Sequence, residues 1–249
     1  MNWREKLTAV TSENNSLLCV GLDTDLGKIP RFIVETSRNP QFDFNKAIID
    51  ATRDLVCAYK LNMAFYEAAG KKGLEELEKT IQYIPRDIFI ILDGKRNDIG
   101  NTAQKYAFSL FETLKADAVT INPYLGKDGV SPFLDYKDKC SFILCRTSNP
   151  SAGDFQDLMV SSAPLYQIVA QKIKEWNVNS NCGAVVGATY PEELRTVRAI
   201  LGEQIPILIP GIGKQGGDVE KTVRNGTSSK KDMALINSSR EVLFAGSGE

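Results

Sequence analysis

Short apolar runs recur along the whole sequence, and each of them ends in polar residues. Most are continuous rather than alternating, as expected for strands of a parallel sheet that is buried on both faces. Eight such runs are present, at residues 17–22, 57–61, 88–92, 118–121, 142–145, 184–187, 205–209 and 233–236. Eight buried parallel strands can be arranged in only a few kinds of sheet.

Helical patterns lie between most of these runs. A spacing close to 3.6 residues predicts helices over 44–56 (Ala47, Ile48, Ala51, Leu55), 74–84 (Leu74, Leu77, Ile81, Ile84) and 102–114 (Ala103, Ala107, Leu110, Leu114). Pro191 stands where a first helical turn accepts proline, ahead of Leu194, Val197 and Leu201. The crossover over 126–136 is expected to be short and irregular.

Eight strands that alternate with helices predict an α/β fold, the (β/α)8 or TIM barrel. A doubly wound sheet is the alternative, but it would not need eight such runs. We find no internal linker or low-complexity tract, so one barrel domain over residues 1–249 is expected.

The chain contains no histidine, so acid–base chemistry near neutral pH must use Lys, Asp, Glu, Cys or Tyr. Histidine triads and Cys/His zinc sites are thereby excluded. The net charge is −1, from 30 basic and 31 acidic residues, so the chain lacks the excess of positive charge that is typical of nucleic-acid-binding proteins.

Five cysteines are scattered without a CxxC pair, which suits a reducing compartment, and a cytoplasmic location is expected. The N-terminus is too charged for a secretory signal, and no apolar stretch approaches the roughly 18 residues of a membrane span.

In a barrel of this kind, functional residues lie at the C-terminal ends of the strands and in the loops that follow. The polar residues after each apolar run are therefore the candidates. In chain order they are Asp23, Lys60, Asn62, Asp93, Lys95, Asp98, Asn122, Thr147, Ser148, Thr189, residues 211–215, Ser239 and Arg240.

Asp93, Lys95 and Asp98 form the most informative group. Asp93 and Lys95 are two residues apart at a strand end, so both can point into the barrel mouth. Carboxylates on both sides keep a lysine protonated, which makes Lys95 an obvious proton donor, and they would repel a substrate carboxylate. The alternative is a solvated cluster of surface ion pairs, which is the more common meaning of such a pattern when it stands alone.

A second group is the glycine-rich segment 209–218, paired with Arg240 after the eighth run. Barrels frequently bind phosphate after strands seven and eight, where glycines let backbone N–H groups approach an anion. A helix N-terminus near Gly217 would add its dipole, and Arg240 can bind phosphate oxygens bidentately. By itself, the glycine segment would more often be a plain turn.

Lys60 follows the second run and has three interpretations. It could reach solvent, act as a Schiff-base nucleophile, or serve as a hydrogen-bonding partner of Asp93. Because the two residues end adjacent strands, the third interpretation is favoured.

With these motifs in place, nearly the whole sequence resembles the orotidine 5′-phosphate decarboxylase family. The resemblance rests on residues 20–23, 60–62, 92–102 and 210–217 with Ser239-Arg240, and the run from Leu92 to Thr102 is highly specific. Residues 146–150 and 187–191 further resemble the longer microbial and protozoan branch. The resemblance implies a barrel homodimer that converts orotidine 5′-phosphate to uridine 5′-phosphate and carbon dioxide, without a metal or an organic cofactor.

The resemblance also implies a role for each matched residue. Asp23 and Lys60 would hold the ribose hydroxyls, with help from Asn62. Asp93 would lie beside the substrate carboxylate, and Lys95 would deliver the proton to C6 of the pyrimidine.

Other matched residues would serve the partner subunit, the base and the phosphate. Asp98 and Thr102 would reach into the partner subunit's site, and Thr147 and Ser148 would face the pyrimidine. The phosphate would be held by Gln215, Arg240 and backbone N–H groups near Gly213.

One departure concerns the end of the chain. The family pattern continues past Ser239-Arg240 into a full last helix, whereas this sequence ends at Glu249, so a shortened last helix is expected.

Two rival functions remain at this point. A related sugar-phosphate decarboxylase would use magnesium and place a carboxylate where Lys60 stands. A non-catalytic phosphate-binding barrel would not need a lysine flanked by two acids.

Overall fold

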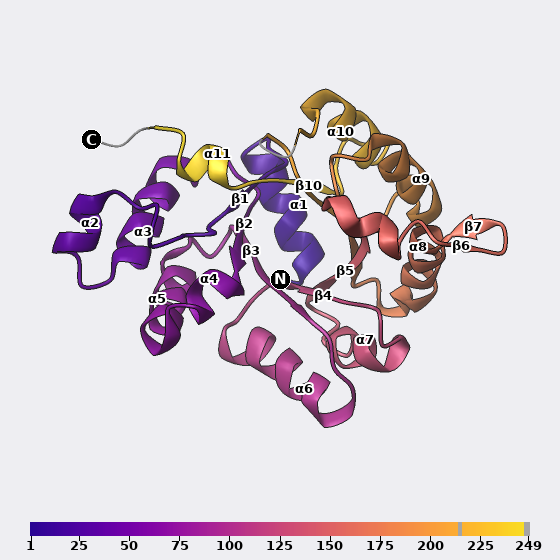
Figure 1. Cartoon of the computed structure of the whole chain (residues 1–249), viewed down its shortest axis with the longest axis horizontal. Helices are drawn as coiled ribbons and strands as arrows, with labels where there is room; N and C mark the ends of the chain where they lie inside the picture. The colour runs from indigo at the N-terminus through magenta and orange to yellow at the C-terminus, as the bar shows by residue number, and fades with distance from the viewer. Residues whose placement is uncertain (214–215, 247–249) are drawn as a thin grey trace.

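Eight parallel strands close into a barrel in the computed structural model, which describes residues 1–213 and 216–246. Around the barrel the strand order is β1-β10-β9-β8-β5-β4-β3-β2, and helices surround the strands (Figure 1). The strands are β1 (Leu18–Gly21), β2 (Ala58–Asn62), β3 (Phe89–Arg96), β4 (Ala118–Ile121), β5 (Cys140–Arg146), β8 (Cys182–Val186), β9 (Ile207–Pro210) and β10 (Ala234–Ser238). All eight predicted runs are barrel strands, so the predicted TIM barrel is confirmed.

The helices of the described residues include those that the sequence predicted. They are α1 (Trp3–Glu13), α2 (Arg31–Thr36), α3 (Pro40–Thr52), α4 (Met63–Glu67), α5 (Gly70–Tyr83), α6 (Gly100–Phe108), α7 (Lys127–Leu134), α8 (Leu165–Trp176), α9 (Pro191–Leu201), α10 (Val219–Gly226) and α11 (Arg240–Leu243). A π-helical turn, η1 (Ser109–Thr113), extends α6 to nearly the predicted end. Between β10 and residue 246, where the description ends, the helix present is the four-residue α11, in line with the expected short last helix.

Two helix predictions were wrong in detail. In α3 the buried residues are Pro40, Gln41, Phe44, Asn45 and Ile49, whereas the predicted face (Ala47, Ile48, Ala51, Leu55) is exposed or half-buried. The amides of Gln41 and Asn45 are buried because they bond to neighbouring elements, a contact that apolar spacing does not reveal. The 126–136 crossover is a regular helix, α7, despite Pro132 within it.

Helix α1 closes the N-terminal end of the barrel. Its side chains Trp3, Leu7 and Val10 are buried in the core. The Arg4 guanidinium donates to the Gln204 carbonyl just before β9. At the opposite end the strand termini remain open, which leaves that end free to hold a site.

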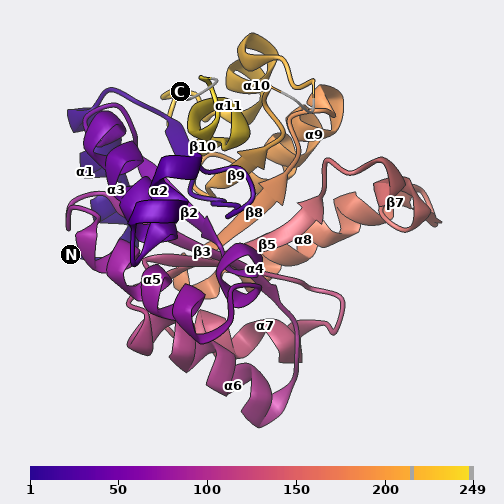
Figure 2. The same cartoon turned by 60° about the vertical axis from the view of Figure 1, so that its left-hand side comes forward.

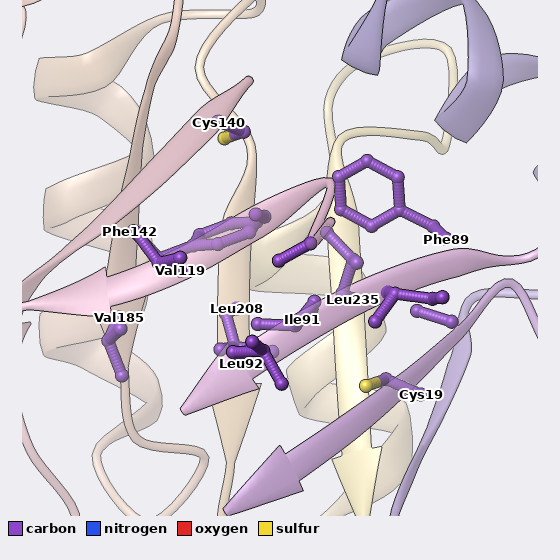
Figure 3. Packing of buried hydrophobic residues seen from close by; sticks show 14 of the residues in the cluster. Cys19, Phe89, Ile91, Leu92, Val119, Cys140, Phe142, Val185, Leu208 and Leu235 are labelled. Carbon is purple, nitrogen blue, oxygen red and sulfur yellow. The ribbon is translucent and has the colours of Figure 1, made fainter. Parts of the chain in front are cut away.

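The barrel interior changes from apolar to polar along the strand direction. Phe142, Val185, Leu208 and Leu235 fill its middle (Figure 3). Gly183 makes room for the Phe142 ring, since a Cβ there would lie 2.5 Å from a ring carbon. Further along, the inward residues of β2 to β4 are polar (Lys60, Asp93, Thr120), and the site begins there.

The segment between β5 and α8 is the longest excursion at the open end. It contains the 3-10 helix η2 (Pro150–Asp154) and a two-stranded hairpin, β6 (Met159–Val160) with β7 (Ala163–Pro164). Both cartoon views show this hairpin projecting from the barrel (Figures 1 and 2). In the part of the chain described here, no helix has the length and apolarity that crossing a bilayer requires.

Arg198 on α9 holds the start of β9 and β10 in place. Its guanidinium donates five hydrogen bonds of 2.7–3.0 Å, to the carbonyls of Gly202, Ile205, Gly226 and Met233. Burial lowers the pKa of Arg198 to about 10, so the side chain remains charged at neutral pH.

Arg198→Met is expected to lower the free energy of unfolding by about 2–4 kcal/mol, because it leaves buried carbonyls without donors. Arg195→Met on the same helix is the control, since Arg195 forms an exposed pair with Glu192 and should change stability by less than about 0.5 kcal/mol. Urea unfolding of both variants measures the difference. Equal stability of the two variants would contradict the structural role of Arg198.

Candidate active site

A cavity of about 650 Å³ opens at the C-terminal ends of the barrel strands. Sequence candidates from six of the eight predicted strand ends line it, those after β1, β2, β3, β5, β9 and β10. The lining residues include Asp23, Lys60, Asn62, Asp93, Lys95, Thr120, Thr147, Ser148, Gln156, Gly211, Asn237, Ser239, Arg240 and Glu241. Most of the candidates from the sequence therefore meet in one place.

Lys60 lies between two carboxylates at the base of this cavity. Its Nζ is 3.2 Å from Asp23 Oδ1 and 3.3 Å from Asp93 Oδ2, and the side chain is only 4% exposed. Strand register explains the contact, because Lys60 pairs with Ile91 and Asn62 pairs with Asp93. The interpretation of Lys60 as the partner of Asp93 is confirmed in geometry.

Asp93 also binds Lys95 and Thr120. Lys95 Nζ donates to Asp93 Oδ1 over 2.7 Å, and Thr120 Oγ1 donates to the same oxygen over 2.7 Å. The expected proximity of Asp93 and Lys95 is therefore confirmed. The Lys95 side chain is 48% exposed, so its ammonium faces the cavity and solvent together.

Lys95 adopts a backbone conformation that is unusual for a lysine. Its φ is 45°, in the left-handed region, and the β3–β4 register shifts between Leu92 and Arg96. The Lys95 N–H donates to Thr120 Oγ1 over 3.0 Å and holds this bulge. Bulges of this kind redirect side chains next to active sites.

The two buried charges stabilise each other. Burial alone would raise the pKa of Asp93, but the ammonium groups of Lys60 and Lys95 outweigh it and hold that pKa well below its ordinary value of 3.8. Burial alone would lower the pKa of Lys60, but Asp23 and Asp93 raise it above its ordinary 10.5. Both groups are therefore charged at neutral pH.

Asp23 is fixed from the other side of the barrel. Ser239 Oγ donates to Asp23 Oδ2 over 2.7 Å, across the pairing of β1 with β10. Asn62 caps α4, with its Oδ1 accepting from the Ala64 N–H at 3.2 Å, and its side chain lines the cavity.

The glycine-rich segment and Arg240 lie on the β9–β10 side of the cavity, together with Gly211 and Ile212. Gly213 has φ 82°, and helix α10 starts at Val219, near the expected Gly217. Gln215, the predicted phosphate ligand, lies outside the described residues. The Glu241 carboxylate packs against Gly213, which leaves no room for a side chain at that position.

Thr147 and Ser148 line the cavity on the β5 side. Their loop lies close to β8, because a Cβ on Gly187 would lie 2.7–2.9 Å from Ser148 atoms. Glycine at this position therefore allows the loop to approach the barrel mouth.

Five of the sequence candidates that the structure describes do not line this cavity: Asp98, Thr102, Asn122, Thr189 and Gly213. Asp98 and Thr102 lie on the β3–α6 connection and the first turn of α6, outside the chain's own site. Asn122 Oδ1 accepts from the Tyr124 N–H in its own loop, and the Thr189 hydroxyl is buried without a hydrogen-bond partner among the described residues.

The polar residues of the site that sequence reasoning missed include Thr120 and Gln156. Thr120 stands within an apolar run, and strand alternation in β4 was the available signal that it points inward. Gln156 lies in the loop after η2, ten residues beyond β5, and nothing in the local pattern marks it.

Comparison with known proteins places this geometry in context. The family model described as "Orotidine 5'-phosphate decarboxylase / HUMPS family" matches residues 16–249. The curated orotidine 5′-phosphate decarboxylase of Cellvibrio japonicus is 49% identical over 255 residues, covering 100% of this chain and 92% of that protein.

Solved structures agree with this match. The structure of Leishmania donovani OMP decarboxylase has a TM-score of 0.88 at 38% identity, covering 99% of this chain and 92% of that one. The structure of Leishmania donovani UMP synthase has a TM-score of 0.91 at 39% identity and covers 99% of this chain, which spans 53% of that longer protein. With its closed barrel and its match to the family model over most of its length, this chain belongs to the orotidine 5′-phosphate decarboxylase / HUMPS family.

Proposed function

We propose that this chain decarboxylates orotidine 5′-phosphate to uridine 5′-phosphate, with Lys95 as the proton donor. The observation that carries the proposal is the Asp93 carboxylate, held at 2.7 Å from Lys95 Nζ in the cavity mouth. The family match and the curated relative at 49% identity support the same reaction.

The chemistry is a replacement of CO2 by a proton at C6 of the pyrimidine. The bond from C6 to the carboxylate breaks, its electron pair remains on C6, and an N–H proton of Lys95 moves to that carbon. Asp93 is ionised and buried, so it repels the substrate carboxylate while it attracts the Lys95 ammonium. Loss of CO2 relieves this repulsion, so the site favours the transition state over the bound substrate.

Two lysines contact Asp93, and their exposure distinguishes their roles. Lys60 is 4% exposed on its side chain and held between two carboxylates, which raise its pKa and make it a poor proton donor. Lys95 is 48% exposed, so water can return its proton after each turnover. Lys60 therefore positions Asp23 and Asp93, and we assign the ribose hydroxyls to the Asp23–Lys60 side with Asn62 nearby.

We assign phosphate binding to the β9–β10 side of the cavity. Among the residues that the structure describes, Arg240 and the backbone N–H groups at Gly213 would hold the phosphate. Gln215 is the further ligand implied by the resemblance. A phosphate held there is remote from C6, and its binding energy can position the pyrimidine ring beside Lys95.

A continuous assay of orotidine 5′-phosphate absorbance, with and without a chelator, tests the reaction. We expect loss of substrate signal that EDTA leaves unchanged, because the Lys60 ammonium stands between the carboxylates that a divalent cation would bridge. Absence of turnover would overturn the proposal. Turnover abolished by EDTA would favour the magnesium-dependent sugar-phosphate type of chemistry.

We further propose a homodimer in which Asp98 and Thr102 complete the partner subunit's site. Exposed apolar side chains lie on or beside this connection, including Ile99 (55%) and Leu125 (44%). Gly129 of α7 lies against the Asp98 carbonyl and Leu125, so these groups share one face. Such a patch on the rim of the barrel mouth is suited to a two-fold contact.

Mixing inactive variants tests the shared site. Lys95→Ala and Asp98→Ala chains, each inactive alone, are expected to regain about a quarter of wild-type activity after equimolar mixing and exchange. Half of the dimers are then mixed, and each of these holds one intact site. Two Lys95→Ala preparations mixed together serve as the control, and no recovery in the mixed sample would exclude sharing of Asp98.

We place the protein in the cytoplasm. All five cysteines are free and buried, and burial raises the pKa of Cys57, Cys145 and Cys182 to about 12, which makes these thiols unreactive.

A further inference from the structure

A buried polar network lies behind the part of the cavity wall that Asp23 forms. Its members, each at most 1% exposed, are Thr24, Gln41, Asn45, Tyr66 and Thr80. Thr24 directly follows Asp23, whereas the other members belong to α3, α4 and α5. Polar side chains are costly to bury in a helix face that apolar residues could fill, and such exceptions gather at sites of function.

Hydrogen bonding fixes the orientation of the Asn45 amide. Thr80 Oγ1 donates its proton to the Glu76 carbonyl over 2.7 Å, so toward Asn45 it can only accept. Asn45 therefore turns Nδ2 toward Thr80 Oγ1, at 3.2 Å, and the same Nδ2 donates to Tyr66 Oη over 3.0 Å. Asn45 Oδ1 then faces Thr24 and accepts from its hydroxyl. The donors run in one direction, from Thr24 through Asn45 to Tyr66.

Tyr66 closes this circuit on the other side of Asp23. Its Oη accepts from Asn45 and donates to the Leu22 carbonyl over 2.8 Å. Burial raises the pKa of Tyr66, so the hydroxyl keeps the proton that it donates. The Leu22 N–H is held as well, by the Lys60 carbonyl at 2.8 Å. The circuit therefore begins on the residue after Asp23 and ends on the residue before it.

Gln41 ties the same loop to α4. Its Nε2 donates to the Thr24 carbonyl at 2.8 Å and to the Phe65 carbonyl at 3.1 Å. Thr24 is thus held through its hydroxyl and through its carbonyl, while the Asp23 carboxylate faces Lys60 Nζ at 3.2 Å. A carboxylate whose two neighbours in the chain are fixed in this way needs little reordering when a ligand binds.

We propose that Tyr66 is a positioning residue that holds the Asp23 carboxylate in place for the ribose hydroxyls of the nucleotide. The inference rests on the proposed function and deepens it, because that function places these hydroxyls on the Asp23–Lys60 side of the cavity. Without the Tyr66 hydroxyl, the Leu22 carbonyl is buried without its donor, and the backbone at Asp23 shifts to find another. The carboxylate then loses its alignment with the ribose, whereas the phosphate and the base are held by other strands.

The test is the preference for uridine 5′-monophosphate over its 2′,3′-dideoxy analogue, measured by calorimetry as a ratio of dissociation constants. Both ligands carry the same base and phosphate, so the ratio isolates the ribose hydroxyls. Tyr66→Phe removes one hydroxyl and keeps the ring, and the preference should fall by about tenfold.

Tyr59→Phe is the matched control. Tyr59 is as deeply buried as Tyr66, and its hydroxyl lies 2.7 Å from Thr52 Oγ1 and 3.3 Å from the Ile49 carbonyl, both on α3. This variant also loses a buried hydroxyl that bonds to a backbone carbonyl, but that carbonyl does not adjoin Asp23. It should therefore keep the wild-type ratio.

Thr24 supplies a second pair of variants. Thr24→Val removes the donor to Asn45 and should lower the ratio in the same direction, whereas Thr24→Ser retains the hydroxyl and should keep the preference. This pair decides the question if Tyr66→Phe does not fold.

A wild-type ratio in Tyr66→Phe would overturn the role, and so would an equal fall in Tyr59→Phe or a wild-type protein that binds both ligands alike. A purely structural loosening would weaken both ligands by the same factor, leave the ratio unchanged and count against the proposal. Wild-type protein without decarboxylase activity would overturn the proposed function, whereas active protein with an unchanged ratio in the variants would overturn only this inference.

Discussion

Lys95→Ala is expected to lower kcat by about two to four orders of magnitude, while uridine 5′-phosphate still binds within about tenfold of wild type. The substitution removes the ammonium that lies 2.7 Å from Asp93 Oδ1 and supplies the proton. Ribose and phosphate contacts come from other strands, so binding should survive. Single-turnover kinetics and calorimetry separate the two quantities.

Lys115→Ala is the matched control for this variant. Lys115 also has a positive φ, 57° against 45° for Lys95, and it also pairs with a carboxylate, Glu112, at 3.2 Å. It lies on the surface between η1 and β4, away from the cavity, so its removal should leave kcat unchanged. A Lys95→Ala enzyme that retains more than about 1% of wild-type turnover would contradict the role of proton donor.

Lys60→Met is expected to lower both stability and activity. The substitution leaves Asp23 and Asp93 without their shared cation in a site where Lys60 is 3% exposed, so the free energy of unfolding should fall by about 3–5 kcal/mol. Asp93 also loses the hydrogen bond from Lys60 that helps to orient its carboxylate, so kcat/KM should fall by at least about 100-fold. Urea unfolding and steady-state kinetics measure the two effects.

The stability loss should depend on pH in a defined direction. In the wild type, the lowered pKa of Asp93 contributes stability that is complete above the ordinary value of 3.8 and is lost as pH falls toward the folded-state pKa. The raised pKa of Lys60 contributes stability that is complete below 10.5 and is lost as pH rises through the folded-state pKa. The gap between wild type and Lys60→Met is therefore largest near neutral pH and shrinks in acid, where the unpaired carboxylates take up protons.

Lys172→Met provides the control, because Lys172 forms an exposed pair with Glu175 and should change stability by less than about 0.5 kcal/mol at any pH. A Lys60→Met protein as stable as this control at pH 7 would show that the buried carboxylates do not depend on Lys60.

The barrel could be predicted because its strands are buried on both faces, so each strand appears in the sequence as a continuous apolar run. The strand-end rule then located Asp23, Lys60, Asp93 and Lys95 without any knowledge of side-chain contacts. The strand register places these residues together, because the pairing of β2 with β3 brings Lys60 beside Asp93. These are properties of the backbone pattern, and one sequence is enough to reveal them.

What could not be predicted depends on loops and on buried polar contacts. Gln156 reaches Thr147 only because η2 folds the chain back toward β5, and no periodic signal records that turn. The buried face of α3 was misplaced because Asn45 is buried through hydrogen bonds to Tyr66 and Thr80 rather than through apolar packing. The part of the phosphate site that involves Gln215 lies outside the described residues and stays a prediction.

The hydrogen bond from Ser239 to Asp23 joins residues 216 positions apart, across the seam where β1 meets β10. During synthesis, therefore, Asp23 emerges from the ribosome long before its partner exists. Until β10 arrives, the growing sheet has two open edges, at β1 and β9, whose unpaired backbone groups can pair with other chains. The cavity is complete only after β10 has been synthesised, and a ligand that binds it would favour the closed barrel over these open-edged forms.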